Sequence, residues 1–242
     1  MNISSNGWSL SLDLSGGRIK ELSHSGVKVF GTYNRIDGKQ GNTHLCVPSF
    51  DKEGMEKWGL PFHGLVRNCL WSEEHRTENE LSISTQTEPS IVYPASLKVE
   101  QTFTLSDVFT HTVAVSHISG NEVPLNIGVH YYWDTPKGWN DTQINNANIK
   151  ANIETNGTTH LESKNKIVFP HATYELTSSG FNTAVLWTSF KTSEKGDKTY
   201  SQDFCCIEPV LDWPGYFGSE GSVLKNGEKK IASLMIGAGE RT

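Results

Sequence analysis

The chain has 242 residues, of which 36% are hydrophobic and 20% charged, and its net charge of −6 comes from interspersed acidic and basic residues. Because no basic stripe is present, we expect no nucleic-acid partner. No apolar run approaches the ~20 residues that a membrane-spanning helix needs. The N-terminus lacks the basic segment and apolar core of a signal peptide. We therefore expect a cytoplasmic protein without a membrane partner.

Alternation of apolar and polar residues dominates the chain and is typical of β-strands. The alternating runs are WSLSLDL (8–14), ELSISTQT (80–87), LKVEQTFTL (97–105), FTHTVAVSHI (109–118) and AVLWTSF (184–190). Turn-forming residues separate them, and only 51–60 has room for a short helical turn. This pattern predicts an all-β, antiparallel sandwich or barrel. Because no linker or composition shift interrupts it, we expect residues 1–242 to form a single domain.

The string LPFHGLVRN places His63 four residues before Arg67, with Gly64 directly after the histidine. In an extended strand the two side chains would lie on the same face. Gly64 allows close approach of the backbone or of a ligand. An arginine offers a rigid fork of donors for hydroxyl groups or a phosphate. The alternative is that Arg67 only caps carbonyl groups at the end of a strand.

The string GVHYYW precedes 134–146, a stretch rich in turn-forming residues that we expect to be an exposed loop. In extended chain His130 and Tyr132 share one face, and Tyr131 and Trp133 the other. Aromatic side chains pack on the apolar faces of sugars, and histidine donates or accepts hydrogen bonds near neutral pH. The alternative is that these side chains belong to the core.

The string CCIEPV places Glu208 between Ile207 and Pro209 at the end of an apolar run. Burying a carboxylate is costly unless it is paired or its pKa is raised, and a raised pKa suits a general base. The alternative is an edge strand with Glu208 facing solvent, which Pro209 would tolerate. The aromatic, Gly-rich segment 210–221 that follows would suit the rim of a carbohydrate site.

The remaining candidates are less specific. Arg35 in YNRIDGK is either a second substrate contact or a turn residue. The four cysteines form no CxxC pair, and the adjacent Cys205 and Cys206 would point to opposite faces of a strand. We therefore expect buried thiols rather than a disulfide framework or a metal site. No motif for a phosphate-binding loop or an organic cofactor is present.

Taken in order, these strings resemble the galactose mutarotase-like (aldose 1-epimerase) superfamily, and especially its hexose-6-phosphate mutarotase branch. The matching elements are Arg35, Gly41, CVPSF (46–50), HGLVRNCLW (63–71), His130 with Tyr132 and Trp133, Cys206 with Glu208 and Pro209, and LKNGE (224–228). No acidic residue between His130 and Glu208 matches the sugar-binding carboxylate that relatives carry there.

The resemblance implies an antiparallel β-supersandwich that interconverts the anomers of a sugar without a metal or cofactor. By similarity, Glu208 removes the proton of the C1 hydroxyl and His130 protonates the ring oxygen. His63, Arg67 and Arg35 would bind the substrate. Two guanidinium groups would match a phosphorylated hexose. We expect a monomer or weak dimer.

Two other functions are open at this point. The chain could be a carbohydrate-binding or sensing protein that keeps the pocket without turnover. It could also be another sugar-active enzyme on the same fold, such as an isomerase, lyase or hydrolase, because a fold does not fix a function.

Overall fold

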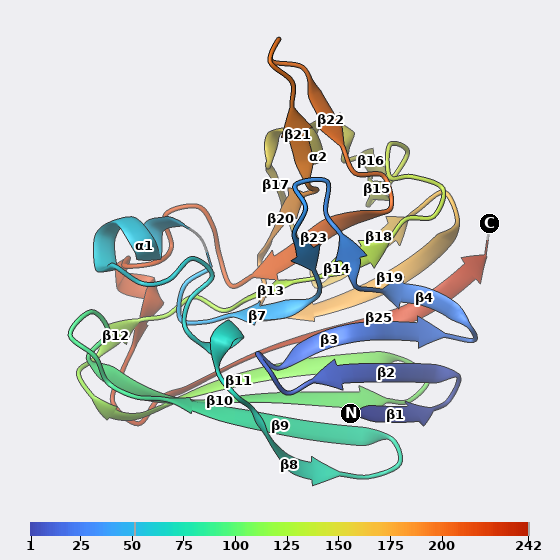
Figure 1. Ribbon diagram of the computed structural model, residues 1–242. Coiled ribbons are helices and arrows are strands. Elements are labelled where there is room, and N and C mark those ends of the chain that lie inside the picture. Colours follow the sequence, from blue (N-terminus) through green and yellow to red (C-terminus); the bar gives the residue numbers. More distant parts are fainter. Residues whose placement is uncertain (51, 242) are drawn as a thin grey trace.

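Two large antiparallel β-sheets packed face to face make up most of the computed structural model, which describes residues 1–50 and 52–241 (Figure 1). Strand β10 (Ala95–Leu105) shows why these segments form strands, because nearly every second residue is fully buried. Successive side chains of a strand point to opposite faces, so the apolar positions line one face of the sheet.

The first sheet has ten strands and carries the strings that contain His130 and Glu208. In spatial order its main path is β1 (Asn2–Ser5), β2 (Trp8–Asp13), β3 (Arg18–His24), β4 (Val27–Phe30), β14 (Tyr132–Asp134), β23 (Phe204–Val210), β13 (Gly128–His130) and β7 (His44–Cys46). A branch adds β20 (Thr183–Trp187), which pairs with β23, and β17 (Thr158–His160), which pairs with β20.

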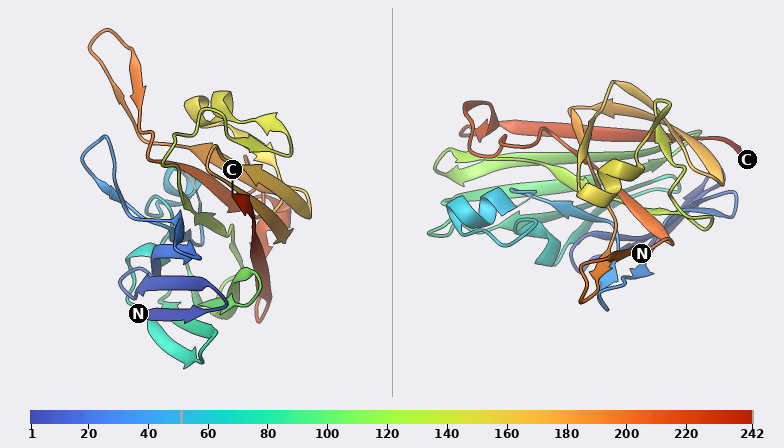
Figure 2. Two further views of the ribbon diagram at one scale, coloured as in Figure 1. Left: turned by 90° about the vertical axis from the view of Figure 1, so that its right-hand side faces the viewer. Right: turned by 90° about the horizontal axis from the view of Figure 1, so that it is seen from above.

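The second sheet has nine strands and forms the other layer of the sandwich. Its order is β16 (Ala147–Asn148), β15 (Gln143–Ile144), β18 (Lys164–Val168), β19 (Ala172–Ser179), β25 (Lys229–Arg241), β11 (Phe109–Gly120), β10, β9 (Glu80–Thr87) and β8 (Ser72–Arg76). Its central strands β10, β11 and β25 are its longest, with 11, 12 and 13 residues. Figure 2 shows the molecule from two further sides.

Short elements connect and extend the two layers. Three two-stranded ribbons are β5 (Tyr33–Asn34) with β6 (Gln40–Gly41), β12 (Val123–Pro124) with β24 (Val223–Leu224), and β21 (Phe190–Thr192) with β22 (Lys198–Tyr200). The helices are α1 (Lys52–Trp58), α2 (Lys150–Thr155) and the 3₁₀ turns η1 (Val66–Asn68) and η2 (Glu220–Ser222). Within the described ranges, no helix has the length and apolar character needed to cross a membrane.

Aromatic side chains from both sheets meet in the core. The rings of Trp8 on β2 and Phe30 on β4 lie 5.9 and 6.5 Å from the ring of Phe109 on β11 in the opposite sheet. Tyr131 and Trp133 also lie in this core and contact Phe30. Full burial of a side chain of this size stabilises the fold by about 1.5–3 kcal/mol.

The predicted all-β, antiparallel sandwich is confirmed, and the alternating runs at 8–14, 80–87, 97–105 and 109–118 correspond to β2, β9, β10 and β11. The prediction of an exposed loop at 134–146 holds only in part. Pro136, Lys137, Asn140 and Asp141 are exposed, but Thr135, Trp139 and Thr142 are fully buried within the segment. Turn-forming residues there mark a change of direction, and the single tryptophan anchors the segment to the protein.

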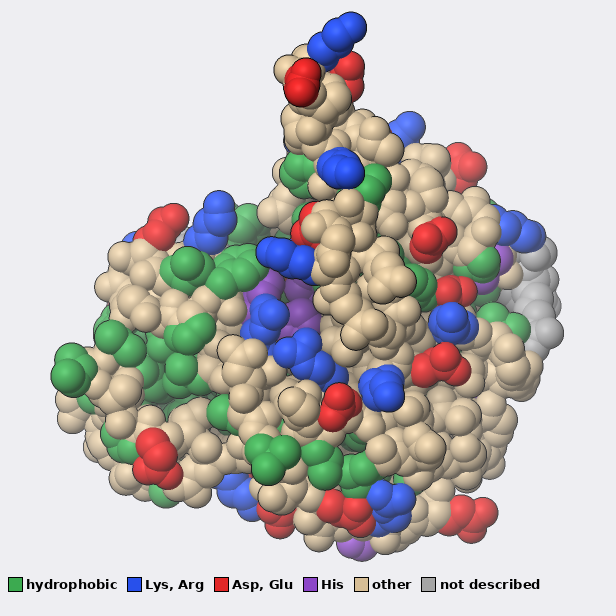
Figure 3. Space-filling model, viewed as in Figure 1, with side chains coloured by type: hydrophobic (Ala, Val, Ile, Leu, Met, Phe, Trp, Pro, Cys, Tyr) green, Lys and Arg blue, Asp and Glu red, His purple; other side chains and the backbone are tan. Residues whose placement is uncertain are grey.

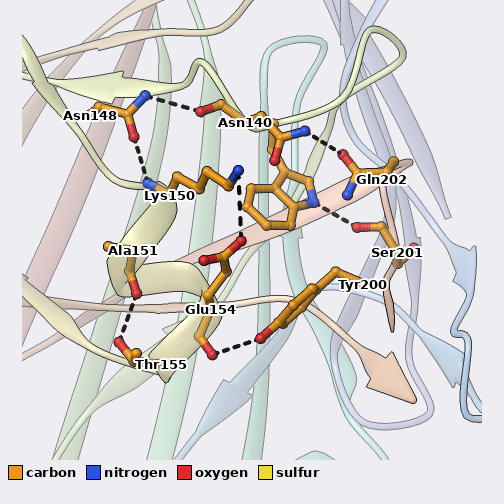
Figure 4. A network of polar contacts seen from close by, with 10 residues as sticks. Asn140, Asn148, Lys150, Ala151, Glu154, Thr155, Tyr200, Ser201 and Gln202 are labelled. Atoms are coloured by element: carbon orange, nitrogen blue, oxygen red, sulfur yellow. Dashed lines mark hydrogen bonds and ion pairs between the residues drawn. The ribbon is translucent and has the colours of Figure 1, made fainter. Parts of the chain in front are cut away.

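Polar contacts connect three parts of the chain here: segment 134–146, helix α2 and the base of the β21–β22 ribbon (Figure 4). The indole Nε1 of Trp139 donates to the carbonyl oxygen of Ser201 at 2.6 Å, and the hydroxyl of Tyr200 donates to the carbonyl of Glu154 at 3.1 Å. The β5–β6 and β21–β22 ribbons both project from the face of the molecule seen in Figure 1 (Figure 2). They form one side of the hollow described below.

Candidate active site

Glu208 lies on an interior strand rather than an edge. All seven residues of β23 are buried, and Glu208 is only 2% exposed. On one side β23 pairs with β20, where Val185 is opposite Glu208. On the other side it pairs first with β14 and then with β13. The alternative of a solvent-facing carboxylate on an edge strand is therefore excluded.

His130 is the last residue of β13 and faces Glu208. Its Nε2 lies 3.5 Å from Oε1 of Glu208. The imidazole is stacked between two rings, that of His44 at 4.9 Å and that of Tyr132 at 4.8 Å between centroids. The first follows from the strand register, which pairs His130 with His44 on β7. The second confirms the prediction that His130 and Tyr132 share one face.

His63 approaches His130 and Glu208 from a turn, so the strand predicted for LPFHGLVRN is wrong. Both His63 and Gly64 have positive φ angles, 64° and 75°, and η1 then carries Arg67. The turn packs against the backbone of Val47 and Pro48. Nδ1 of His63 donates to the carbonyl oxygen of Phe50 at 2.8 Å, which fixes the orientation of the ring.

We expect Gly64→Ala to destabilise the fold more than Gly38→Ala. Both glycines have positive φ, 75° and 83°, a conformation that costs other residues about 1–3 kcal/mol. Only at Gly64 would a Cβ also collide with backbone, that of Val47 and Pro48, whereas at Gly38 the space is open. Urea unfolding measures both free energies. Equal losses in the two variants would contradict the close packing of this turn.

His63, His130 and Glu208 meet at the floor of a cavity of about 670 Å³. In the space-filling view, histidine side chains lie at the bottom of a hollow with basic side chains at its edge (Figure 3). The lining residues are Arg35, Asp37, Phe50, Lys52, Glu56, Phe62, His63, His130, Asn156, Val185, Trp187, Phe190, Glu208 and Trp213. Aromatic walls around a few buried polar groups are typical of a small-molecule site.

The two candidate arginines take different places. Arg35, in the β5–β6 ribbon, lines the cavity, forms an ion pair with Asp37 at 2.7 Å and lies over the ring of Trp187 at 4.8 Å. Arg67 is not among the residues that line the cavity. Its charge is nevertheless close enough to lower the pKa of His63 and His130.

Burial decides the protonation of the acid–base candidates. It raises the pKa of Glu208 well above the usual value, and the nearby charge of Arg35 offsets this only in part. Burial also lowers the pKa of His130 well below the usual value, and repulsion from the nearby basic side chains His44, His63, Arg35 and Arg67 lowers it further. The pKa of His63 falls to about 4 for the same main reason. All three groups therefore favour their uncharged forms.

Several residues in or beside the cavity are not predicted from the sequence. His44 does not line the cavity but lies within a strand-like run and stacks on His130. Trp187 ends the alternating run 184–190, but nothing in that run indicates which face meets a cavity. Lys52 and Trp213 come from segments flanked by turns, and Trp213 agrees with the expected rim in 210–221.

Metal-ligating side chains also gather here, which the sequence spacing did not indicate. Two groups of three buried residues each bring their ligand atoms within 4.8 Å of one another: His44 with Cys46 and His63, and His130 with Cys206 and Glu208. The cysteines at 46, 205 and 206 are buried as expected, whereas Cys69 is only half-buried. Cys205 packs in the main core and Cys206 beside Tyr132, so the two do face opposite sides of β23.

Comparison with known families decides the classification. Residues 17–169, more than half of the chain, match the family described as aldose 1-epimerase. The chain belongs to the aldose 1-epimerase family. Within the matched region lie His63 and His130, whereas Glu208 lies beyond it. No curated protein matches this member of the family.

The similarity to solved structures with the same fold covers nearly the whole chain. A galactose mutarotase related enzyme from Lactobacillus acidophilus is 14% identical, with coverage of 100% of this chain and 98% of that one and a TM-score of 0.75. A galactose mutarotase-like protein from Lactobacillus casei is 13% identical, with 99% of each chain covered and a TM-score of 0.76. A third, from Clostridium acetobutylicum, is 15% identical, covers 100% and 95%, and has a TM-score of 0.71. These likenesses establish the galactose mutarotase-like sandwich.

Proposed function

We propose that this protein is a mutarotase that interconverts the α and β anomers of a hexose or hexose 6-phosphate. The observation that carries the proposal is the pairing of His130 and Glu208, 3.5 Å apart and buried at the floor of the cavity. Membership of the aldose 1-epimerase family supports a sugar substrate and an isomerase-type reaction. Opening a pyranose ring needs a base at one oxygen of C1 and an acid at the other.

In the proposed reaction the pair supplies both groups. In the reactive form the single proton of the pair lies on His130 and Glu208 is ionised. Glu208 then takes the proton of the C1 hydroxyl while His130 protonates the ring oxygen, and the bond between C1 and that oxygen breaks. The free aldehyde rotates about C1–C2, and closure returns both protons in the reverse direction. Each turnover leaves the pair with the proton it held at the start. His63, whose Nδ1 is held by the Phe50 carbonyl, offers its other ring nitrogen to a sugar hydroxyl.

The walls of the cavity are suited to a pyranose ring. The rings of Phe62, Trp187 and Trp213 line it, and aromatic faces pack well against the C–H faces of sugars. The carboxylate of Asp37 also lines it and is held by Arg35 at 2.7 Å. We propose that Asp37 provides the acidic sugar contact for which the sequence between His130 and Glu208 offers no match.

A phosphorylated substrate would meet Arg35 and Lys52, the basic side chains that line the cavity. We expect Arg35→Gln to raise KM for glucose 6-phosphate roughly ten- to hundredfold, since a hydrogen bond to a charged group contributes about 1.5–3 kcal/mol. The change for glucose should be much smaller. Arg76→Gln, an exposed arginine on β8, is the matched control. Equal changes in KM for both sugars would argue against a phosphate at Arg35.

The pH dependence should show a broad plateau around neutral pH. His130 and Glu208 titrate as a coupled pair, and one proton on the pair is the active form. Because burial lowers the pKa of His130, the second proton enters, and activity falls, well below the usual histidine value of 6.5. Because burial raises the pKa of Glu208, the last proton leaves well above 4.5. A pH profile of kcat/KM tests this, and an acidic limb at or above 6.5 would contradict it.

Exchange spectroscopy with a panel of sugars tests the proposed function. Glucose, galactose and glucose 6-phosphate are each followed by NMR in low-phosphate buffer, with and without the protein, because phosphate itself catalyses anomer exchange. Exchange of one sugar above the buffer rate supports the mutarotase. Tight binding of a sugar with exchange at the buffer rate for all three would instead support a carbohydrate-binding or sensing protein.

We also propose that residues 1–242 form one domain. A single hydrophobic core includes Ile3 near the start of the chain and Ile236 near its end. Side chains of both large sheets contribute to it, and neither sheet could bury its apolar face without the other.

A further inference from the structure

A second set of chemically capable side chains lies beside the acid–base pair. His44 and Cys46 are alternate residues of β7 and therefore point to the same face. His63 joins them because its turn forms a bridge with the residue that follows Cys46, through Gly64 and Val47. Potential ligand atoms of the three side chains lie within 4.8 Å of one another. All three residues are more than 90% buried.

Hydrogen bonds fix the protonation of both imidazoles. Nδ1 of His44 lies 2.8 Å from the carbonyl oxygen of Asn42, and Nδ1 of His63 lies 2.8 Å from that of Phe50. A carbonyl oxygen only accepts, so each Nδ1 carries the proton and each Nε2 keeps a lone pair. Metal-binding histidines in proteins show this arrangement.

The Nε2 of His44 needs a partner. It is buried and has no hydrogen-bond partner within residues 1–50 and 52–241. Such a group costs free energy unless something meets its lone pair. Because the Nδ1 side is already held by Asn42, this position is suited to a ligand that accepts an electron pair.

We propose that His44, Cys46 and His63 bind a zinc-class divalent ion through two imidazole nitrogens and one thiolate. Three protein ligands with a fourth position open are the arrangement of accessible zinc sites. The open position would face the cavity, which His63 lines. Binding releases one proton, that of the Cys46 thiol, to solvent, and no electron transfer is involved.

The surrounding charges make the thiolate essential. Arg18 and Arg67 lie near enough to act electrostatically on both His44 and Cys46. Their positive charge opposes a cation but favours ionisation of the Cys46 thiol, whose pKa is raised by burial and by the nearby carboxylate of Glu208. An ion held by two neutral imidazoles alone would face this repulsion without compensation. Replacing the cysteine should therefore abolish binding rather than weaken it.

The neighbouring group of His130, Cys206 and Glu208 fits an ion less well. Its histidine and carboxylate already face each other at 3.5 Å. Nδ1 of His130 has no hydrogen-bond partner among the described residues, so nothing fixes which nitrogen carries the proton. The first group has both imidazoles oriented in advance, and we therefore place the ion there.

Cobalt spectroscopy tests the proposal without reference to activity. Co²⁺ is titrated into the protein, and a thiolate–cobalt charge-transfer band in the near ultraviolet, with strong visible bands of a tetrahedral ion, reports a sulfur ligand. We expect saturation at one ion per chain and displacement by Zn²⁺. Cys46→Ser should remove the charge-transfer band, whereas Cys206→Ser and Cys205→Ser should keep it. Cys205 is the matched control because it is buried on the opposite face.

Three results would overturn the proposal: no charge-transfer band in the unmodified protein, a band that survives Cys46→Ser, or a band lost in Cys206→Ser. His44→Gln provides a second variant that keeps all cysteines, and it should lower the affinity for Co²⁺ at least tenfold. Because the ion would occupy the Nε2 of His63 that is proposed to meet a sugar hydroxyl, and because His44 stacks on His130 at 4.9 Å, Zn²⁺ should also inhibit anomer exchange. That consequence alone rests on the proposed function.

Discussion

Glu208→Gln should lower kcat for anomer exchange by about 10²–10⁴-fold, the usual contribution of a positioned proton-transfer group. Glutamine keeps the size of the side chain but cannot take the proton of the C1 hydroxyl. KM should change little, because the amide still fills the same place at the cavity floor. The fold should be retained or slightly stabilised, because the change removes a buried carboxylate that is costly to desolvate.

Steady-state kinetics of purified Glu208→Gln measure this effect, with Glu175→Gln as the matched control. Glu175 is an exposed residue of β19 on the other sheet, so its replacement should leave kcat unchanged. Unaltered turnover in Glu208→Gln, in a protein whose unfolding free energy is preserved, would remove Glu208 from the mechanism.

His130→Asn should cause a loss of similar size, about 10²–10⁴-fold in kcat. Asparagine can still form a hydrogen bond but cannot deliver a proton to the ring oxygen. The variant also loses the stacking of His130 on His44 and Tyr132, so a modest loss of stability is expected as well. The control is His160→Asn, an exposed histidine on β17.

The double variant distinguishes one catalytic unit from two independent groups. Residues that act together are strongly non-additive, so His130→Asn combined with Glu208→Gln should be little slower than either alone. Sugar binding, measured by calorimetry, should persist in all three proteins. Multiplicative losses would mean that the two groups act in separate steps.

The fold could be predicted from the sequence because its signal is local. Alternation in 80–87 and 97–105 predicts strands and also shows which side chains of each strand face the core. Strands β9 and β10 follow those runs closely. The same logic placed His130 and Tyr132 together, since two residues apart in extended chain means one face. Glu208 was recognisable because a carboxylate within an apolar run requires a special environment.

The parts of the site that could not be predicted depend on non-local packing. Nothing in LPFHGLVRN indicates that His63 has a positive φ of 64°; the turn exists because Gly64 packs against Val47 from a distant segment. Arg67 consequently enters η1 and does not line the cavity. A strand would have placed it beside His63.

The gathering of His44, Cys46 and His63 is hidden from sequence for the same reason. The spacing of these residues matches no common metal motif, and the grouping appears only when β7 pairs with β13 and the His63 turn packs on Val47. Trp139 gives a similar lesson, because a tryptophan among turn-forming residues anchors a segment whose neighbours suggest exposure.

The most direct test of the central claim is magnetisation transfer between the α and β signals of one sugar, measured side by side for the unmodified protein, Glu208→Gln and His130→Asn in low-phosphate buffer. The account predicts exchange well above the buffer rate for the unmodified protein and exchange at or near the buffer rate for both variants. Exchange at the buffer rate for all three proteins, or undiminished exchange in either variant, would contradict catalysis by the His130–Glu208 pair.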